Sequence, residues 1–372
     1  MNTYRSIKTA LSIVSTALVL SILSVSAFAA ALPEQALSHA NPRVQEVMAV
    51  QEAVTPDLMP MPDVLGTAVG QDDDGELTIL VYVNLEGKNP AASARNIPKN
   101  LRGKNIKVEF TEPFRALARP VAGSTKVSHT AKQTPPIQLG TSGGWRYDLA
   151  NGYCCGGTLG SLVKIGTTQY ILSNYHVFES DIVLGGNGIV AASADPIIQP
   201  GLIDVGCVAN GAQNVATLAK NIKDSSLPGS NVDASIAQVM TGVVRTDGAI
   251  LEIGTISATT VGASLKKAVK KSGRTTGLTR STISGLNASV SVIYDNECAG
   301  GTAFTKTFTG QIIISNSGSK FLAGGDSGSL MVEDVATKPR AVGLLFAGSS
   351  TLAVANPIAE VLTFFGATMV GK

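Results

Sequence analysis

From about residue 137 to residue 366, the sequence alternates short apolar runs with clusters of glycine, serine, asparagine and threonine. Runs of this length suit β-strands and are too short for most helices. They are Gly157–Lys164, Tyr170–Asn174, Val232–Met240, Ile312–Ser315, Ser329–Val332 and Ala341–Phe346. The pattern predicts an all-β barrel or sandwich, closed by a helix over Pro357–Phe365.

The composition excludes several other classes of protein. Hydrophobic residues make up 44% of the chain and charged residues 15%, with a net charge of +2. A disordered chain has fewer apolar residues and more charge, and a nucleic-acid-binding domain is usually basic. The four cysteines form no C-x-x-C pair and the three histidines are scattered. We therefore expect no nucleic acid partner, no bound metal and no cofactor.

The first residues read as a secretory signal peptide. Arg5 and Lys8 precede an apolar run from Ala10 to Val25, and Ala27-Phe28-Ala29 supplies a small-x-small cleavage pattern. A retained membrane anchor is the alternative, but serines interrupt the run and it is short for a spanning helix. We expect removal of residues 1–29, no remaining anchor, and a protein that is secreted or periplasmic.

Residues 30–118 predict a small α+β domain that precedes the β domain. The expected elements are a helix over 42–54, strands over 64–69 and 76–83, a weak helix over 91–101 and a strand over 106–110. The turn Asp72-Asp73-Asp74 lacks the full pattern of a calcium loop, so its carboxylates are expected to be solvated. Residues 119–136 have the composition of a linker, and residues 137–372 form the β domain.

Three residues in the β domain have the types needed for nucleophilic catalysis. Ser327 lies in Gly324-Gly325-Asp326-Ser327-Gly328, where glycines allow a tight turn that exposes a hydroxyl and aims backbone N–H groups at one point. His176 follows a hydrophobic strand and Asp233 begins one. Taken singly, His176 could be a core histidine, Asp233 a turn residue and Ser327 part of an ordinary Gly-Ser turn. Their order, histidine, aspartate, serine, matches one known order of a catalytic triad.

With these residues in place, residues 137–366 resemble the chymotrypsin-like (trypsin-like) serine peptidases, and most of all the bacterial trypsin-like group that includes Narrow Leaf-type peptidases. The segments that carry the resemblance are Cys155–Leu159, Leu172–His176, Gln199–Gly201, Lys271–Gly277, Gly325–Leu330 and Val342–Ser349. The resemblance implies a mainly β, chymotrypsin-like double β-barrel with His176, Asp233 and Ser327 in the cleft. It also implies an oxyanion hole made by the N–H groups of Gly325 and Ser327.

The same resemblance places the substrate pocket at Phe321, Phe346, Ala347 and Gly348. The segments around these residues contain no acidic side chain, which predicts cleavage after apolar or small residues. Phe346 stands where the family has a serine that supports the aspartate. Support for Asp233 is therefore expected from another part of the chain.

A further expectation concerns the residue that supports the serine turn. Bacterial relatives pair the aspartate before the nucleophile with an internal arginine, which predicts an ion pair between Arg274 and Asp326. The alternative is that Arg274 is a solvated turn residue.

The predicted disulfide joins Cys207 to Cys298, with Cys155 as a small apolar residue inside the barrel. The alternative is four free thiols.

The sequence thus predicts a secreted serine endopeptidase that acts on polypeptides through a His176–Asp233–Ser327 triad. One alternative is an inactive, trypsin-like binding module. A second is an esterase of the α/β-hydrolase group, which the absence of Gly-x-Ser-x-Gly and the early histidine disfavour. The sequence alone leaves open the physiological substrate, the oligomeric state and whether residues 30–135 are removed.

Overall fold

The computed structural model describes residues 36–116, 127–150, 153–179, 191–219, 230–294 and 303–372. The expected signal peptide (1–29), the first part of the expected linker and Cys298 lie outside these residues. Within the described ranges, no helix has both the length and the apolar character needed to span a membrane.

The first of two barrels uses residues 137–239 and the last residues of the chain. Its strands are β6 (Thr141–Trp145), β9 (Gly157–Leu159), β10 (Ser161–Ile165), β11 (Thr168–Ser173), β12 (Pro196–Gln199), β13 (Gln213–Leu218), β14 (Ser235–Val239) and β23 (Thr368–Met369). They lie in the order β23, β10, β11, β14, β13, β12, β6, β9. The backbone N–H of Gly140 donates to Leu159 and that of Gly160 donates to Leu172. The link between β9 and β10 therefore hydrogen-bonds to the segment before β6 and to β11, and this closes the sheet into a barrel.

The second barrel is a closed ring of six strands. They are β17 (Ala268–Gly273), β18 (Gly277–Tyr294), β19 (Phe304–Ser315), β20 (Leu330–Glu333), β21 (Ala341–Gly348) and β22 (Leu352–Pro357). Around the ring the order is β17, β20, β21, β22, β19, β18, and β17 also pairs with β18. Helix α4 (Ile358–Phe365) follows β22, where the sequence predicts the closing helix.

Residues 42–111 form the predicted order of helices and strands, except that the helix expected over 91–101 ends at Asn96 and the short strand β3 follows it. They are α1 (Pro42–Leu58), β1 (Val64–Gln71), β2 (Leu77–Asn84), α2 (Pro90–Asn96), β3 (Asn100–Leu101) and β4 (Lys104–Thr111). Asn41 caps α1 by accepting a hydrogen bond from the backbone N–H of Arg43, and Pro42 fits the first turn. Strands β1 and β2 are antiparallel, whereas β2 and β4 are parallel and connected through α2.

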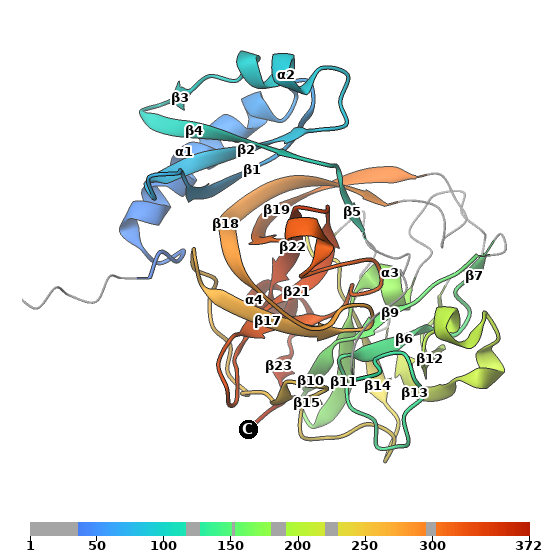
Figure 1. Cartoon of the computed structure of the whole chain (residues 1–372). Helices are drawn as coiled ribbons and strands as arrows, with labels where there is room; N and C mark the ends of the chain where they lie inside the picture. The colour runs from blue at the N-terminus through green and yellow to red at the C-terminus, as the bar shows by residue number, and fades with distance from the viewer. Residues whose placement is uncertain (1–35, 117–126, 151–152, 180–190, 220–229, 295–302) are drawn as a thin grey trace, which may run out of the picture. The chain divides into compact units, whose positions relative to one another are not determined.

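This α+β segment is joined to the second barrel by backbone pairing. Strand β1 pairs antiparallel with β18, with Gly66 opposite Val290 (Figure 1). The apolar face of α1, which includes Val47 and Leu58, belongs to the same core cluster as Leu345 of β21. One continuous sheet and one continuous core therefore connect the segment to the barrel.

A short strand then returns the chain to the barrel. Strand β5 (Phe114–Ala116) lies between β18, to which it is parallel, and β21, to which it is antiparallel. The smaller elements are α3 (Tyr175–Phe178), β7 (Leu149–Ala150), β8 (Tyr153–Cys154), β15 (Ala249–Ile250), β16 (Gly254–Thr255) and the 3₁₀ helices Leu202–Val205, Ala209–Gly211 and Ser317–Ser319.

The described part of the expected linker packs against the first barrel. His129 is buried, and its Nδ1 lies 2.7 Å from the backbone oxygen of Gly140. Its Nε2 lies 2.7 Å from Oε2 of Glu252. Gln133 exchanges hydrogen bonds with Gln138 and also bonds to Gln199. Residues 127–136 are thus held by specific contacts.

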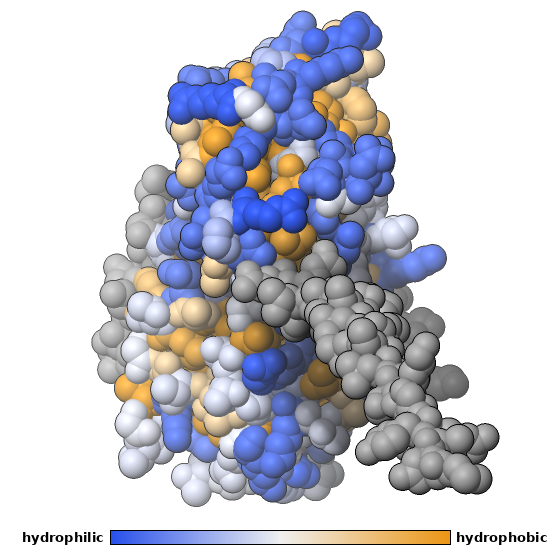
Figure 2. All heavy atoms as spheres, turned by 90° about the vertical axis from the view of Figure 1, so that its left-hand side faces the viewer, coloured by the Kyte–Doolittle hydropathy of each residue, from blue (hydrophilic) through white to orange (hydrophobic). Residues whose placement is uncertain are grey.

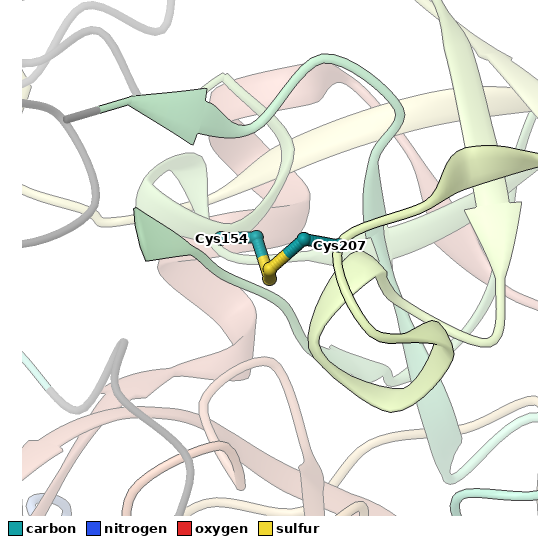
Figure 3. The surroundings of a disulfide bond; sticks show 2 residues. All are labelled: Cys154 and Cys207. Atoms are coloured by element: carbon teal, nitrogen blue, oxygen red, sulfur yellow. A yellow bond between two sulfur atoms is a disulfide. The ribbon is translucent and has the colours of Figure 1, made fainter. Parts of the chain in front are cut away.

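The predicted disulfide between Cys207 and Cys298 is wrong. Cys207 is bonded to Cys154, across a sequence separation of 53 residues (Figure 3). Cys155 is disulfide-bonded as well, so its predicted role as a free apolar residue is also wrong. The physical reason lies in β8, which ends at Cys154, beside the loop after Leu202–Val205, where Cys207 adopts a φ of 62°.

The architecture confirms the predicted fold class, mainly β with two barrels preceded by α and β elements. It is not the parallel α/β sheet of an α/β-hydrolase, because the described pairings within both barrels are antiparallel. The face in Figure 2 shows hydrophilic residues mixed with small apolar patches, as expected for a chain with 15% charged residues.

Candidate active site

Two paired strands of the first barrel position His176 and Asp233. In the antiparallel pair β11 and β14, Ser173 lies opposite Ser235. His176 follows Ser173 in the short helix α3, and Asp233 precedes Ser235. Both side chains therefore emerge at the same end of the same strand pair. The structure brings these two predicted residues together.

A short hydrogen bond joins them. His176 Nδ1 lies 2.6 Å from Oδ2 of Asp233, and both side chains are buried. The backbone N–H of His176 also donates to Oδ1 of Asp233 at 3.3 Å. A carboxylate only accepts hydrogen bonds, so the proton resides on Nδ1 and Nε2 is the nitrogen that can accept one.

Tyr294, at the end of β18, supplies the support for Asp233 that the sequence predicts without locating. Its hydroxyl donates to Oδ2 of Asp233 at 2.8 Å. Burial, together with the negative charge of Asp233, raises the pKa of Tyr294 well above its usual value. The phenol therefore remains protonated and keeps donating. Its ring meets that of His176 edge-on, with centroids 6.1 Å apart.

A second chain of hydrogen bonds holds the backbone of Asp233. The amide N–H of Asp233 donates to Oδ1 of Asn356 at 3.0 Å. Asn356 Nδ2 donates in turn to Oε1 of Gln311 at 2.7 Å. Asn174 Nδ2 donates to the backbone oxygen of Asp233 at 2.7 Å. Asn356 and Gln311 belong to the second barrel, so residues of both barrels fix this aspartate.

The turn that carries Ser327 has the glycine conformations that its sequence predicts, but Ser327 is buried, so the expected exposure of its hydroxyl is wrong. Gly325 has a φ of +93° and Gly328 a φ of +90°, values that favour glycine. A Cβ on Gly328 would lie 2.2 Å from Oγ of Ser173, so this glycine is also required for close packing. The Oγ of Ser327 donates to the backbone oxygen of Phe346 at 3.4 Å. The role of Gly325 and Ser327 as oxyanion donors stays a prediction.

The serine turn packs against the histidine side of the molecule. The backbone N–H of Thr158 donates to the oxygen of Ser327 at 2.8 Å. A Cβ placed on Gly157 would lie 2.6 Å from the side chain of Val177 and 2.9 Å from the oxygen of Ser327. The neighbour of His176 and the backbone of Ser327 thus meet at one glycine of β9.

The predicted ion pair between Arg274 and Asp326 is wrong. Asp326 instead pairs with the ammonium group of Lys271 at 3.1 Å, and both side chains are fully buried. Its Oδ1 accepts from the backbone N–H groups of Thr275 and Thr276, at 2.9 and 3.1 Å. Arg274 pairs with Asp204, with Nε to Oδ2 at 2.9 Å and Nη2 to Oδ1 at 2.5 Å.

Strand geometry explains this exchange of partners. Side chains alternate between the two faces of a strand, so Lys271 and Gly273 of β17 share one face. Strand β17 ends at Gly273, and Arg274 lies in the turn that follows. A Cβ on Gly273 would lie 2.7 Å from Oδ1 of Asp326, which places Asp326 on the face of Lys271. Burial lowers the pKa of Lys271, and the charge of Asp326 opposes that shift. The alternation is visible in the sequence and is the signal that could have identified Lys271.

The four residues expected to form the pocket are all buried. Phe346, Ala347 and Gly348 lie on β21, beside the Ser327 turn. Phe321 precedes that turn, and its side chain joins the core cluster that contains Val342 and Leu345. The pocket assignment stays a prediction.

Lys306 is a further charged residue, one that the sequence does not single out. Its ammonium nitrogen lies 5.1 Å from the ring centroid of Phe308, and that ring lies 4.9 Å from the ring of Phe346. Burial lowers the pKa of Lys306, whereas the charge of Asp233 raises it. A cation therefore lies within the electrostatic field of the Asp233 carboxylate.

The aspartate turn between β1 and β2 stabilises itself. Asp72 Oδ1 accepts from the backbone N–H groups of Asp74 and Glu76, at 3.1 and 2.9 Å. Asp73 pairs with Lys107 at 2.7 Å. Among the residues that the structure describes, no group of three or more histidine, cysteine or acidic side chains is arranged to hold a metal ion.

Comparison with known proteins gives one family model and several solved structures. Thermobifida fusca Protease A is 18% identical, with a TM-score of 0.41, over 63% of this chain and 99% of that one. Cellulomonas bogoriensis chymotrypsin is 19% identical, with a TM-score of 0.38, over 63% and 99%. A glutamic-acid-specific serine protease is 18% identical, with a TM-score of 0.40, over 63% and 100%. No curated protein matches. Residues 225–355 match the model of the Nal1 C-terminal domain.

Proposed function

We propose that the chain is a serine endopeptidase that works outside the cytoplasm. The observation that carries the proposal is the 2.6 Å contact between His176 Nδ1 and Asp233 Oδ2, beside the turn that bears Ser327. A histidine oriented by a buried carboxylate is the general base that a serine nucleophile requires. The apolar stretch at residues 10–25 and the disulfide between Cys154 and Cys207 support an extracytoplasmic location.

In the proposed mechanism, Oγ of Ser327 attacks the carbonyl carbon of the scissile peptide bond. Nε2 of His176 takes the hydroxyl proton as the bond forms and then delivers it to the leaving amine. The N–H groups of Gly325 and Ser327 stabilise the oxyanion of the tetrahedral intermediate. Water then hydrolyses the acyl-enzyme by the same route, with His176 again as base and acid. Asp233 stabilises the imidazolium each time it forms.

The rival is a trypsin-like binding module that retains the turn without catalysis. The polar contacts around Asp233 disfavour it. From the second barrel, Tyr294 bonds to the carboxylate, and Asn356, itself bonded to Gln311, accepts from the backbone N–H of Asp233. Orientation of this kind is needed for proton transfer, and packing alone would be satisfied by apolar residues.

Digestion of an unstructured protein such as casein tests the proposal. We expect internal cleavage by the wild-type chain and a loss of at least about 10⁴-fold in rate for Ser327→Ala. Ser257→Ala changes a partly exposed serine that is distant in sequence from Ser327. It is the matched control and should retain the wild-type rate. Equal rates for Ser327→Ala and the control would refute the proposal.

A further inference from the structure

One edge of β21 carries a series of partners that leads past the nucleophile. Strand β22 pairs along one side of β21. On the other side, Leu344 lies opposite Leu330 of β20, and Leu345 then exchanges backbone hydrogen bonds with Gly328 and Ser329 of the serine turn. The next carbonyl on this side, that of Phe346, accepts from Ser327 Oγ. The part of this β21 edge that follows Phe346 therefore begins next to Ser327.

Strand β5 occupies this part of the edge. Ala116 lies opposite Ala347, and Arg115 lies opposite Gly348, in antiparallel register. Because β5 runs antiparallel to β21, the chain direction from Arg115 to Ala116 points toward Phe346 and Ser327. A peptide paired with β21 in this direction would therefore bring the residues that follow its paired segment to Ser327.

An extended peptide that reaches Ser327 would use the same edge. Extended peptides bind to proteins by adding a strand to an exposed sheet edge, with main-chain hydrogen bonds for affinity and side-chain pockets for specificity. We propose that β5 occupies the strand position of a polypeptide substrate, so that the full chain carries its own competitive inhibitor. This proposal rests on the proposed peptidase function.

Side-chain contacts fasten the segment before β5 to the loop after β21. Thr111 Oγ1 lies 2.7 Å from Oγ of Ser349 and 2.9 Å from Oγ1 of Thr351. Ser350 Oγ donates to Oε1 of Glu112 at 2.6 Å. This hydrogen bond lowers the pKa of Glu112. The inhibitory strand is thus held at its N-terminal side by three polar contacts.

The side chains of β5 indicate the class of peptide that the edge accepts. Phe114 and Ala116 are buried, whereas Arg115 between them is exposed. Both buried residues join an apolar cluster with Tyr175, the neighbour of His176, and with Phe346. A substrate that replaces β5 would therefore present a small apolar residue where Ala116 lies and an aromatic residue where Phe114 lies.

A strand tethered in the same chain is a strong competitor. Short connections give effective concentrations on the order of millimolar. An added peptide must therefore reach a comparable concentration before it displaces β5. The expected consequence is a high KM in the full chain with an intact catalytic centre.

Substitution at Arg115 separates the strand from the catalytic residues. Arg115→Pro removes a backbone N–H inside a strand that has partners on both sides, and it alters an exposed side chain. We expect KM for a peptide containing Phe-Arg-Ala to fall at least tenfold, with kcat changed less than about threefold. The matched control, Arg115→Ala, keeps the N–H and should remain as inhibited as the wild type.

A second measurement applies even if the proline variant fails to fold. Thr111→Val combined with Ser350→Ala removes the polar contacts and keeps the strand, and it should lower KM at least threefold. A blocked synthetic peptide with the sequence of residues 111–116 should inhibit this double variant competitively. An unchanged KM in every variant that folds would overturn the inhibitory role.

Labelling by a small fluorophosphonate separates this proposal from the proposed function. Labelled Ser327 together with an unchanged KM in the variants overturns the inhibitory strand alone. Absence of labelling in the wild type and in every variant overturns the peptidase function and the inhibitor with it.

Discussion

Tyr294 donates its hydroxyl hydrogen to Oδ2 of Asp233 at 2.8 Å, the same oxygen that lies 2.6 Å from Nδ1 of His176. One carboxylate oxygen thus accepts from both a phenol and an imidazole. The phenol comes from the second barrel and the imidazole from the first. Packing of the two barrels against each other therefore assembles the proposed general base with its support.

Removal of the phenol should weaken catalysis without loss of the fold. A hydrogen bond to a charged group contributes about 1.5–3 kcal/mol. Tyr294→Phe is therefore expected to lower kcat by about 10-fold to 100-fold, measured with saturating peptide. The control is Tyr82→Phe, because the buried Tyr82 hydroxyl has no partner among the described residues. An equal fall in kcat for both variants would show a packing effect instead.

The stability of the protein should fall in alkali through these two phenols. Burial raises the pKa of Tyr294 and of Tyr82 in the folded state. The folded chain then binds protons that the unfolded chain releases above about pH 10, so the free energy of unfolding decreases as the pH rises through that value. Urea unfolding between pH 8 and 11 should show a smaller decrease for Tyr294→Phe than for the wild type. Parallel curves would contradict the assignment.

Lys271 should matter more than Arg274 for the serine turn. Loss of one partner of a buried ion pair costs about 3–5 kcal/mol. Lys271→Met leaves Asp326 beside Ser327 without its cation, so both stability and kcat should fall. Arg274→Leu leaves Asp204 without its partner and should lower stability with a smaller change in kcat. A larger kcat loss for Arg274→Leu would reverse the assignment.

The disulfide should stabilise the loop that contains Cys207. The pair closes a sequence separation of 53 residues, for which chain entropy gives about 4 kcal/mol. Cys154→Ser should lower Tm and expose one thiol, at Cys207, to titration under denaturing conditions. A Cys207 that remains linked in this variant would contradict the pairing.

Local patterns in the sequence predict most of the strands and helices, and they single out His176 and Asp233, which the fold brings together. The alternation of apolar runs locates β11 and β14, and these strands bring His176 and Asp233 together once they pair. The glycines around Ser327 predict its turn, because few other residues adopt the required φ.

Long-range partners could not be predicted in this way. The pairing of β1 with β18 and of β5 with β21 joins segments that are far apart in sequence, and local periodicity says nothing of register between them. Tyr294 reads as one more apolar residue at the end of a strand, and only the closed barrel brings it to Asp233. The disulfide prediction was wrong for the same reason, since the spacing of cysteines in the sequence does not determine which of them are bonded.

Covalent labelling of Ser327 tests the central claim most directly. The full chain is treated with a fluorophosphonate, and the modified residue is identified by peptide mass spectrometry. We expect one adduct, on Ser327, that forms at least about 10³-fold more slowly in His176→Ala, because the hydroxyl then lacks its base. An adduct on another residue, or labelling of Ser327 at the same rate in His176→Ala, would contradict the catalytic assignment.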